Sequence, residues 1–539
     1  MPAPDSLIVN GKIHTLVTDN NVVEALAIYD GKIIQTGTNE EIEILRGPKT
    51  KVIDLKGRTA IPGLVDVHTH AASAGIVIKY WIDCLKLKSI KEIQAAVKTR
   101  AEKLEPGKWI LGKGYDEFRL SDGRPPNRRD LDEVSPRNPC AISRRDGHVM
   151  SVNSLALSLA GIDSHTQEPE GGKIYRNSEG KPTGILAENA QKLVMKVSPE
   201  PTIAELKEAI LAAQRKLASW GITAYDEALT TRAEFRAYQD LRNEGKLMLR
   251  VGLILAANFV EAPIAQDAIK VGIQTNFGDD LLRVVGAKLI SDGSLASATA
   301  AMYDPYPTEE ANGILLMNRE ELAASILELM VGGLRPCIHA IGDRAVDVVI
   351  DLIGETLADS KASGSISGDH RIRIEHCGLI SDQTLQKIKS LGICVSSSIG
   401  FLYSLGDSHL QLLGEKRLKG YYLGKSYLEK GIMVAGNSDW DVTPANPLLG
   451  MYGLVTRRTA RGNVIGKEEI LTLAQALEFY TKNPAYLDFQ EISRGTLEVG
   501  KYADITVFEE DIFGMHPEKW KDAKVYMTLV SGKIVYASL

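Results

Sequence analysis

Four histidines, one aspartate and one lysine stand at the ends of short apolar runs of the sequence. His68 and His70 follow the first run, and side chains two residues apart lie on the same face of a strand. Two imidazoles on one strand end can therefore bind one metal ion. The pair also fits a polar strand terminus, so taken alone it leaves both interpretations open. The other four residues lie at or near the ends of later runs: Lys288, His339, His376 and Asp439.

This set of residue types predicts a site for metal-dependent hydrolysis. Histidine nitrogens and a carboxylate oxygen suit Zn²⁺ and related divalent ions. Two ions about 3.5–4 Å apart can activate one bridging water and polarise one substrate oxygen. Lys288 can bridge two ions only after it loses its proton and adds CO₂ to form a carbamate, because an ammonium group repels metal ions. The alternative for Lys288 is a salt bridge to Asp292 or to another carboxylate nearby.

The apolar runs alternate with longer helical stretches, and this alternation is typical of parallel βα units. Eight runs are present, at residues 63–67, 222–225, 249–255, 284–290, 336–338, 372–374, 393–395 and 432–435. Eight such units close into a barrel, which brings the C-terminal ends of its strands to one mouth. We therefore predict an α/β fold of the (β/α)8 TIM type over residues 63–487.

The interval between the first two runs is too long for one barrel crossover. About 155 residues separate Val67 from Ile222, whereas ordinary βα loops contain roughly two to six residues. We interpret residues 80–197, with approximate limits, as an inserted region. Because this region begins at the C-terminal end of the first strand, it can cover the barrel mouth as a lid or as a substrate-recognition element.

The two ends of the chain share a repeated pattern. Asn10-Gly11, Asp30-Gly31 and Ser531-Gly532 each separate two apolar runs, and Asn-Gly and Asp-Gly pairs favour two-residue hairpin turns. We predict a small β-sandwich made from residues 1–62 and 488–539, with the barrel inserted between its halves. Two separate hairpin caps are the alternative.

Composition excludes several classes of protein. A hydrophobic fraction of 44% and a charged fraction of 24% are ordinary for a globular chain. The 63 basic and 69 acidic residues give a net charge of −6, with no basic block that would favour nucleic acid. The sequence has no run of about 18 apolar residues, so we expect no membrane span. Five cysteines without a CxxC pair, and no secretory signal at the start, predict reduced thiols in a cytoplasmic protein. The sequence leaves open whether the protein forms a homodimer.

These residues resemble the amidohydrolase superfamily strand by strand, with HxH on strand 1, Lys on strand 4, His on strands 5 and 6, and Asp on strand 8. The resemblance covers nearly the whole chain. It is closest to the group that includes N-substituted formamide deformylase and many uncharacterised metal-dependent hydrolases. The motifs that carry this closer match are Asp146-Gly147-His148, Asn153 to Leu157, Lys288 to Ser294, His339 to Ala345, and Arg373 to His376.

The resemblance implies a role for each metal ligand. His68 and His70 would hold the more buried ion, His339 and His376 would hold the second, and carboxylated Lys288 would bridge the two. Asp439 would ligate the first ion and carry a proton from the attacking water to the leaving amine. The implied activity is hydrolysis of an amide-type, non-peptide C–N bond through a metal-activated hydroxide. An ester, lactone or carbamate hydrolase with the same metals is the first alternative, and a non-catalytic binding protein on a decayed barrel is the second.

Several weaker candidates come from the inserted region and the strand ends. His148 either donates to the substrate oxygen or packs within the inserted region, and Glu188 either faces the site or starts a helix. Asp343 and Arg344 form an orienting pair or begin a helix. Residues 396–407 are expected to form a flexible loop at the mouth. Buried thiols are expected at Cys337 and Cys377, and an aromatic pocket is expected from Tyr115, Phe401, Tyr403, Trp440 and Tyr452.

Overall fold

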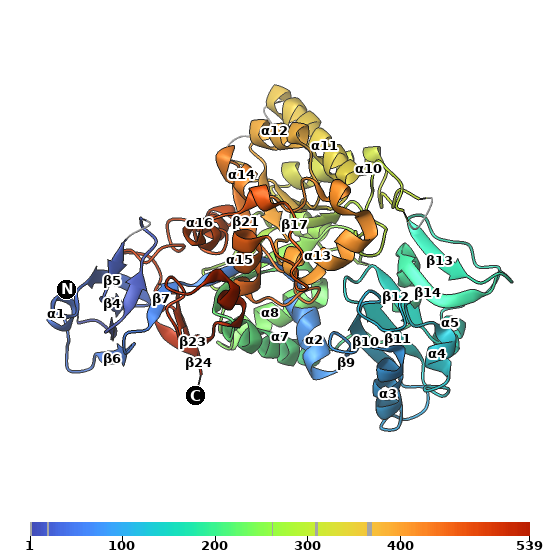
Figure 1. Cartoon of the computed structure of the whole chain (residues 1–539), viewed down its shortest axis with the longest axis horizontal. Helices are drawn as coiled ribbons and strands as arrows, with labels where there is room; N and C mark the ends of the chain where they lie inside the picture. The colour runs from blue at the N-terminus through green and yellow to red at the C-terminus, as the bar shows by residue number, and fades with distance from the viewer. Residues whose placement is uncertain (1–2, 19–20, 261, 308–310, 364–368, 539) are drawn as a thin grey trace.

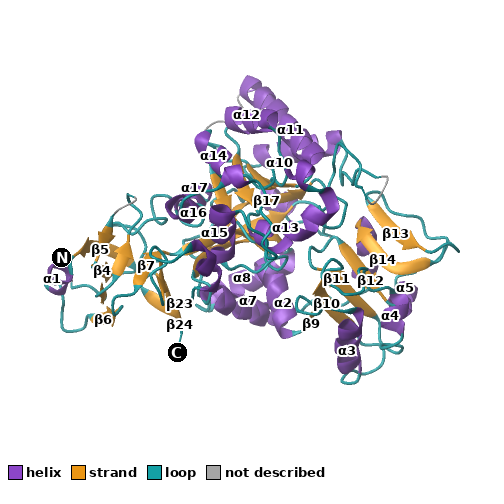
Figure 2. Cartoon of the chain, viewed as in Figure 1, coloured by secondary structure: helices purple, strands orange, loops and turns teal. Residues whose placement is uncertain are grey.

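The computed structural model describes residues 3–18, 21–260, 262–307, 311–363 and 369–538. Its centre is an eight-stranded parallel sheet that curves into a nearly closed TIM-type barrel (Figures 1 and 2). Each of the eight predicted runs overlaps one of its strands, so the barrel prediction is confirmed. The strands, in sheet order, are β8 Leu64–Thr69, β15 Ile222–Thr230, β16 Arg250–Ala256, β17 Leu282–Ile290, β18 Pro336–Ala340, β19 Arg373–His376, β20 Cys394–Ser397 and β21 Val434–Gly436.

Helices cover the outside of the barrel and supply the second layer of the core. The helix α7, for example, begins after a capping box in which Thr202 and Glu205 satisfy each other's backbone N–H groups. Its buried residues recur every three or four positions, which puts them on one face toward the sheet. The outer helices include α7 Ile203–Ala218, α8 Arg232–Asn243, α10 Arg319–Val331, α11 Asp343–Ser363 and α12 Asp382–Leu391.

The seam between the first and last strands is closed in two different ways. At the C-terminal end of the strands, Asp439 N donates to His68 O at 3.0 Å, and Thr69 forms a parallel bridge with Trp440. Toward the other end, the segment 479–480 fills the seam, because Tyr480 O accepts from Val65 N at 2.9 Å. The barrel mouth is therefore closed by the backbone of the residues that carry the predicted metal ligands.

Strands from both ends of the chain pair in one sheet. The strand β22 lies antiparallel to β7, and Ile505 pairs with Pro62. The sheets on this side of the barrel have the order β24-β23-β22-β7-β2-β3 and β5-β4-β1-β6 (Figure 1). The domain limits stay a prediction. The strands are β1 Ser6–Val9, β2 Lys12–His14, β3 Val22–Val23, β4 Ala25–Tyr29, β5 Lys32–Gly37, β6 Lys51–Asp54, β7 Thr59–Pro62, β22 Ile505–Phe508, β23 Val525–Val530 and β24 Lys533–Ala537.

Between β8 and β15 the chain forms a separate mixed sheet beside the barrel, opposite the terminal sheets (Figures 1 and 2). Three helices, α3 Ile90–Ala101, α4 Arg128–Asp132 and α5 Ser154–Leu159, accompany it. No helix in the described part of the chain combines the length and the apolar composition that crossing a bilayer requires. The strands of this sheet, in order, are β13 Gly172–Arg176, β14 Pro182–Glu188, β12 Val149–Val152, β11 Cys140–Arg144, β10 Ile110–Tyr115 and β9 Ile82–Asp83.

The predicted flexible loop at residues 396–407 is wrong. Residues 396 and 397 belong to β20, and the helix α13 Gly400–Leu413 begins three residues later. Phe401, Leu405 and Leu412 of this helix are buried. Their spacing of four and seven residues is helical, and the glycine and serine residues between them obscured that period.

We predict that Arg250→Met weakens the link between the barrel and the C-terminal strands. Arg250 starts β16 and donates to Asp504 from Nε at 2.6 Å and from Nη2 at 3.0 Å. Both side chains are buried, and removing one partner of a buried ion pair costs about 3–5 kcal/mol of unfolding free energy. The variant should unfold at a lower urea concentration, as followed by circular dichroism. An unchanged midpoint would contradict this role for the pair.

Candidate metal centre

The predicted ligands from the first and last strands converge at the barrel mouth. His68 ends β8, His70 caps the following helix, and Asp439 follows β21. One ligand atom of each lies within 4.8 Å of the others. Asp439 Oδ1 is 3.1 Å from His70 Nε2 and 3.5 Å from His68 Nε2. This oxygen is buried and has no hydrogen-bond partner of good geometry among the described residues, so the donor set fits a cation.

The second pair of histidines lies beside this cluster. The ring centroids of His339 and His376 are 4.5 Å apart, and those of His376 and His68 are 4.8 Å apart. His376 Nδ1 is 3.9 Å from Asp439 Oδ2, so Asp439 stands between the two pairs. His376 and Asp439 have φ angles of 69° and 51°. A left-handed backbone at residues other than glycine is typical of functional sites, where the surrounding structure holds it in place.

Lys288 lies at the floor of the centre. The lysine is buried, and its Nζ atom is 2.9 Å from His68 Nε2. Burial lowers the pKa of Lys288 below its ordinary value, which favours the uncharged amine that carbamate formation requires. The alternative, a salt bridge to Asp292 or another nearby carboxylate, does not form among the described residues, and Asp292 instead accepts from the backbone N–H groups of residues 301, 341 and 342.

A buried ion-pair network beneath the ligands was not predicted. Glu375 Oε2 is 2.5 Å from His68 Nδ1, which leaves the Nε2 atom of His68 facing the centre. Arg373 donates to Glu375 at 2.8 Å and to Asp226 at 2.7 Å. Carboxylates in this position orient a metal-binding imidazole. The signal in the sequence was the placement of two charged residues, Arg373 and Glu375, at alternate positions of the short strand that also carries the predicted ligand His376.

The inserted sheet brings two further residues to the mouth. His148 Nδ1 lies 2.9 Å from Glu188 Oε2, and the His148 ring is 5.7 Å from the His339 ring. Burial alone would lower the pKa of His148, but the Glu188 carboxylate, with Asp146 and Asp292 beside it, raises the pKa to about 9. The structure therefore places a charged imidazole beside the second pair of histidines, with Glu188 turned toward it at a φ angle of 50°.

The predicted aromatic pocket does not form as one group. Phe401 stacks on His376 with ring centroids 6.2 Å apart. The other four aromatic residues pack elsewhere: Tyr115 against Ser151, Tyr403 against Tyr452, and Trp440 against Trp220.

The remaining sequence candidates have structural roles. Asp343 begins the helix α11. All five cysteines are free and buried. Burial raises the pKa of Cys337 to about 11 and that of Cys377 to about 12, so both stay thiols at neutral pH.

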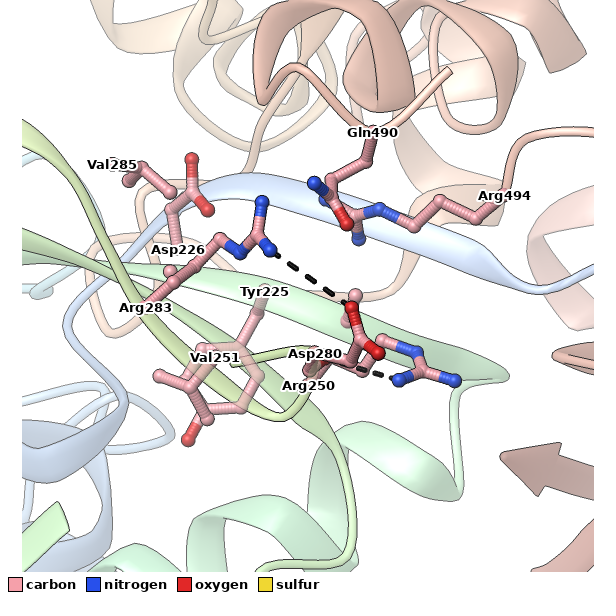
Figure 3. A pocket seen from close by; sticks show the side chains of 11 residues that line it. Tyr225, Asp226, Arg250, Val251, Asp280, Arg283, Val285, Gln490 and Arg494 are labelled. Carbon is pink, nitrogen blue, oxygen red and sulfur yellow. Dashed lines mark hydrogen bonds and ion pairs between the residues drawn. The ribbon is translucent and has the colours of Figure 1, made fainter. Parts of the chain in front are cut away.

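A small hollow lies at the opposite end of the barrel (Figure 3). It contains Arg250 and Arg283 from the starts of β16 and β17, with Asp280 and Arg494 beside them. Arg494 donates to Asp488 at 2.8 Å, and Arg283 is 3.9 Å from Asp280. These charges are matched within the protein, and none of the predicted metal ligands lines the hollow.

Comparison with known proteins decides the family. The Amidohydrolase family profile matches residues 51–536. The chain belongs to the amidohydrolase family. The members of this superfamily are metal-dependent hydrolases, and the ligand set at the mouth of this amidohydrolase agrees with that chemistry.

Similar proteins cover almost the full length of this amidohydrolase. The protein LONG AFTER FAR-RED 3 of Arabidopsis thaliana is 30% identical over 99% of this chain and 91% of its own. N-substituted formamide deformylase of Arthrobacter pascens is 27% identical over 99% of this chain and 98% of its own. An uncharacterized metal-dependent hydrolase from Pyrococcus horikoshii has a TM-score of 0.75 at 27% identity and covers 95% of this chain and 99% of its own.

We predict that Glu188→Gln lowers the pKa of His148. The carboxylate is the first of the groups that raise this pKa, and without it burial, which lowers the pKa, meets less opposition. Histidine NMR titration of the metal-free protein would measure both values. In the unchanged protein, His148 should stay charged until the pH rises toward about 9. A pKa below 7 in the unchanged protein would contradict the pairing.

Proposed function

We propose that this amidohydrolase cleaves an amide-type C–N bond, other than a peptide bond, in a small molecule. The observation that carries the proposal is the position of Asp439 between two pairs of histidines and above a buried lysine. Five barrel strands contribute to this arrangement, and each contributes through a residue at its C-terminal end. The similarity to a formamide deformylase supports a C–N bond as the target.

The ligands divide into two sets. His68, His70 and Asp439 would hold one divalent ion, His339 and His376 would hold a second, and Lys288 as a carbamate would bridge them. Zn²⁺ suits this mixture of nitrogen and oxygen ligands. When bound, such ions supply a nucleophile from water at neutral pH and stabilise negative charge on the substrate oxygen.

Asp439 is the residue that we assign to proton transfer. Burial alone would raise the pKa of this carboxylate, but the imidazoles of His70 and His376 hold it well below its ordinary value. The ionised carboxylate can accept the proton of the attacking water and deliver it to the leaving nitrogen. A positioned acid–base group of this kind contributes about 10²–10⁴-fold to the rate. An amine leaves far more readily when it is protonated, so a proton carrier suits C–N cleavage.

His148 is the residue that we assign to the substrate oxygen. Its Nδ1 atom faces Glu188 at 2.9 Å, so the other nitrogen of the charged ring is left to donate toward the mouth. A fixed donor aimed at a developing negative charge stabilises the transition state more than the ground state.

Location and partners stay proposals. Five buried free thiols suit a reducing compartment, and we propose the cytoplasm. We also propose that the chain acts on a small molecule rather than on nucleic acid or a membrane, either alone or as a homodimer.

Hydrolysis of a substrate panel tests the proposed reaction. Zinc-reconstituted protein should release amines from N-substituted formamides or other small amides, as measured by mass spectrometry. Asp439→Asn should lose most of that turnover, because its amide group cannot accept the proton. Turnover of esters, lactones or carbamates with no amide turnover would favour the first alternative. Failure on every substrate of the panel would favour a non-catalytic protein.

Lys288→Ala tests the bridging role. The variant should bind fewer metal ions per chain than the unchanged protein, as measured by inductively coupled plasma mass spectrometry. Lys192→Ala is the matched control, because that lysine lies over the Phe259 ring and contacts none of the predicted ligands. Full two-ion occupancy in Lys288→Ala would show that Lys288 is not a bridge.

A further inference from the structure

We propose that the inserted region holds the general base in position, and that Arg145 is the residue through which it does so. This inference rests on the role proposed for Asp439. The chain after β21 turns sharply through residues 439–443. The barrel holds the first part of this turn through hydrogen bonds to Asp439, Trp440 and Asp441. Side chains of the inserted sheet bind its second half, so two separate parts of the fold share control of the catalytic carboxylate.

Arg145 follows β11 and reaches across to the turn. Its guanidinium group is buried and donates to Val442 O from Nε at 3.0 Å and from Nη2 at 2.8 Å. A third nitrogen, Nη1, donates to Asp116 of the inserted region at 3.2 Å. A buried arginine that directs two donors at one backbone carbonyl is a costly way to satisfy that oxygen. The arrangement is explained if the position of the carbonyl matters.

Val442 is coupled directly to the general base. Val442 N donates to Asp439 O at 2.7 Å, and Asp439 N donates to His68 O at 3.0 Å. Thr443 Oγ1 also donates to Ser438 O at 2.5 Å, and His70 N donates to Trp440 O, so several bonds hold the turn in which Asp439 has a φ angle of 51°. Arg145 binds the backbone carbonyl of the same residue, Val442. Without it, Val442 O would be left buried and unpaired, and the turn could relax.

A second contact from the inserted sheet supports the same turn. Lys113 Nζ of β10 is 2.6 Å from Asp441 Oδ1, and Asp441 Oδ2 accepts from Ser73 Oγ at 2.9 Å. Ser73 lies on the helix α2 Ala71–Lys79, which begins directly after His70. The inserted sheet, the first barrel loop and the last barrel loop therefore meet at Asp441.

Arg145 is not required merely to attach the inserted region. Asp146 accepts from Ser297 Oγ at 2.5 Å, which joins the same end of the inserted sheet to the loop after β17. That contact involves neither Val442 nor Asp441. A variant that lacks Arg145 can therefore keep the inserted region docked while it releases the turn.

The test compares Arg145→Met with Arg250→Met. Both variants lose a buried arginine that joins the barrel to another sheet, but Arg250 lies at the far end of the barrel. Hydrogen–deuterium exchange of the metal-free proteins should show faster exchange over residues 439–443 in Arg145→Met but not in Arg250→Met. Lys113→Met should give a smaller increase in the same segment, and it serves if Arg145→Met fails to fold. Unchanged exchange of this segment in the folded variants would overturn the proposal.

Kinetics with an amide substrate provide the second readout. Arg145→Met should lower kcat by about 10²-fold, the loss expected for a small displacement of a catalytic group, with KM nearly unchanged. Arg145→Lys should recover part of that loss, because it keeps one donor. In an Asp439→Asn background, Arg145→Met should lower the residual kcat by less than about threefold, because both changes disable the same step.

Two kinetic outcomes would overturn the proposal. One is an equal loss of kcat in Arg145→Met and Arg250→Met, and the other is full additivity with Asp439→Asn. If no substrate of the panel is hydrolysed, the proposed reaction fails, but the exchange measurement still decides whether Arg145 holds the turn.

Discussion

The backbone link between His68 and Asp439 is the constraint on which the rest of the structure depends. These residues belong to the first and last strands of the barrel, yet their main chains are hydrogen-bonded at 3.0 Å. Closing a loop of this length costs conformational entropy that local contacts cannot offset. The packed interior of the barrel and the segment 479–480, which fills the seam away from the mouth, supply buried contacts that offset this entropy cost. The metal ligands of the first and last strands are thus adjacent only because the whole barrel is closed.

Charged side chains occupy the barrel interior, where most proteins of this architecture place apolar ones. Arg373 neutralises both Glu375 and Asp226, and Glu375 in turn orients His68. Each of these groups would be unfavourable if it were buried alone, and together they leave little unpaired charge. Beside this network, Asp439 Oδ1 is buried next to two imidazoles with no hydrogen-bond partner of good geometry among the described residues. A cation is the missing partner that the donor set suits.

The sequence predicted the parts of the site that obey a local rule. Each barrel strand was marked by an apolar run, and a ligand such as His339 directly follows its run, so both were found together. The contacts of Glu375 and Arg145 could not be found in this way, because their partners lie on distant segments that meet only in the folded chain. The helix α13 was missed because Gly400 and Gly406 suggested a loop while the apolar residues kept a helical period. Tyr115 was placed at the mouth by position alone, and it lies in the core of the inserted region instead.

The central claim is that two pairs of histidines, one aspartate and one modified lysine form a metal centre with two ions. A crystal structure of the zinc-loaded protein, with anomalous scattering recorded at the zinc edge, tests this claim most directly. We expect one peak among His68, His70 and Asp439, a second peak beside His339 and His376, and carbamate density on Lys288. Peaks at other residues, or a plain ammonium on Lys288 with the histidines apart, would contradict it.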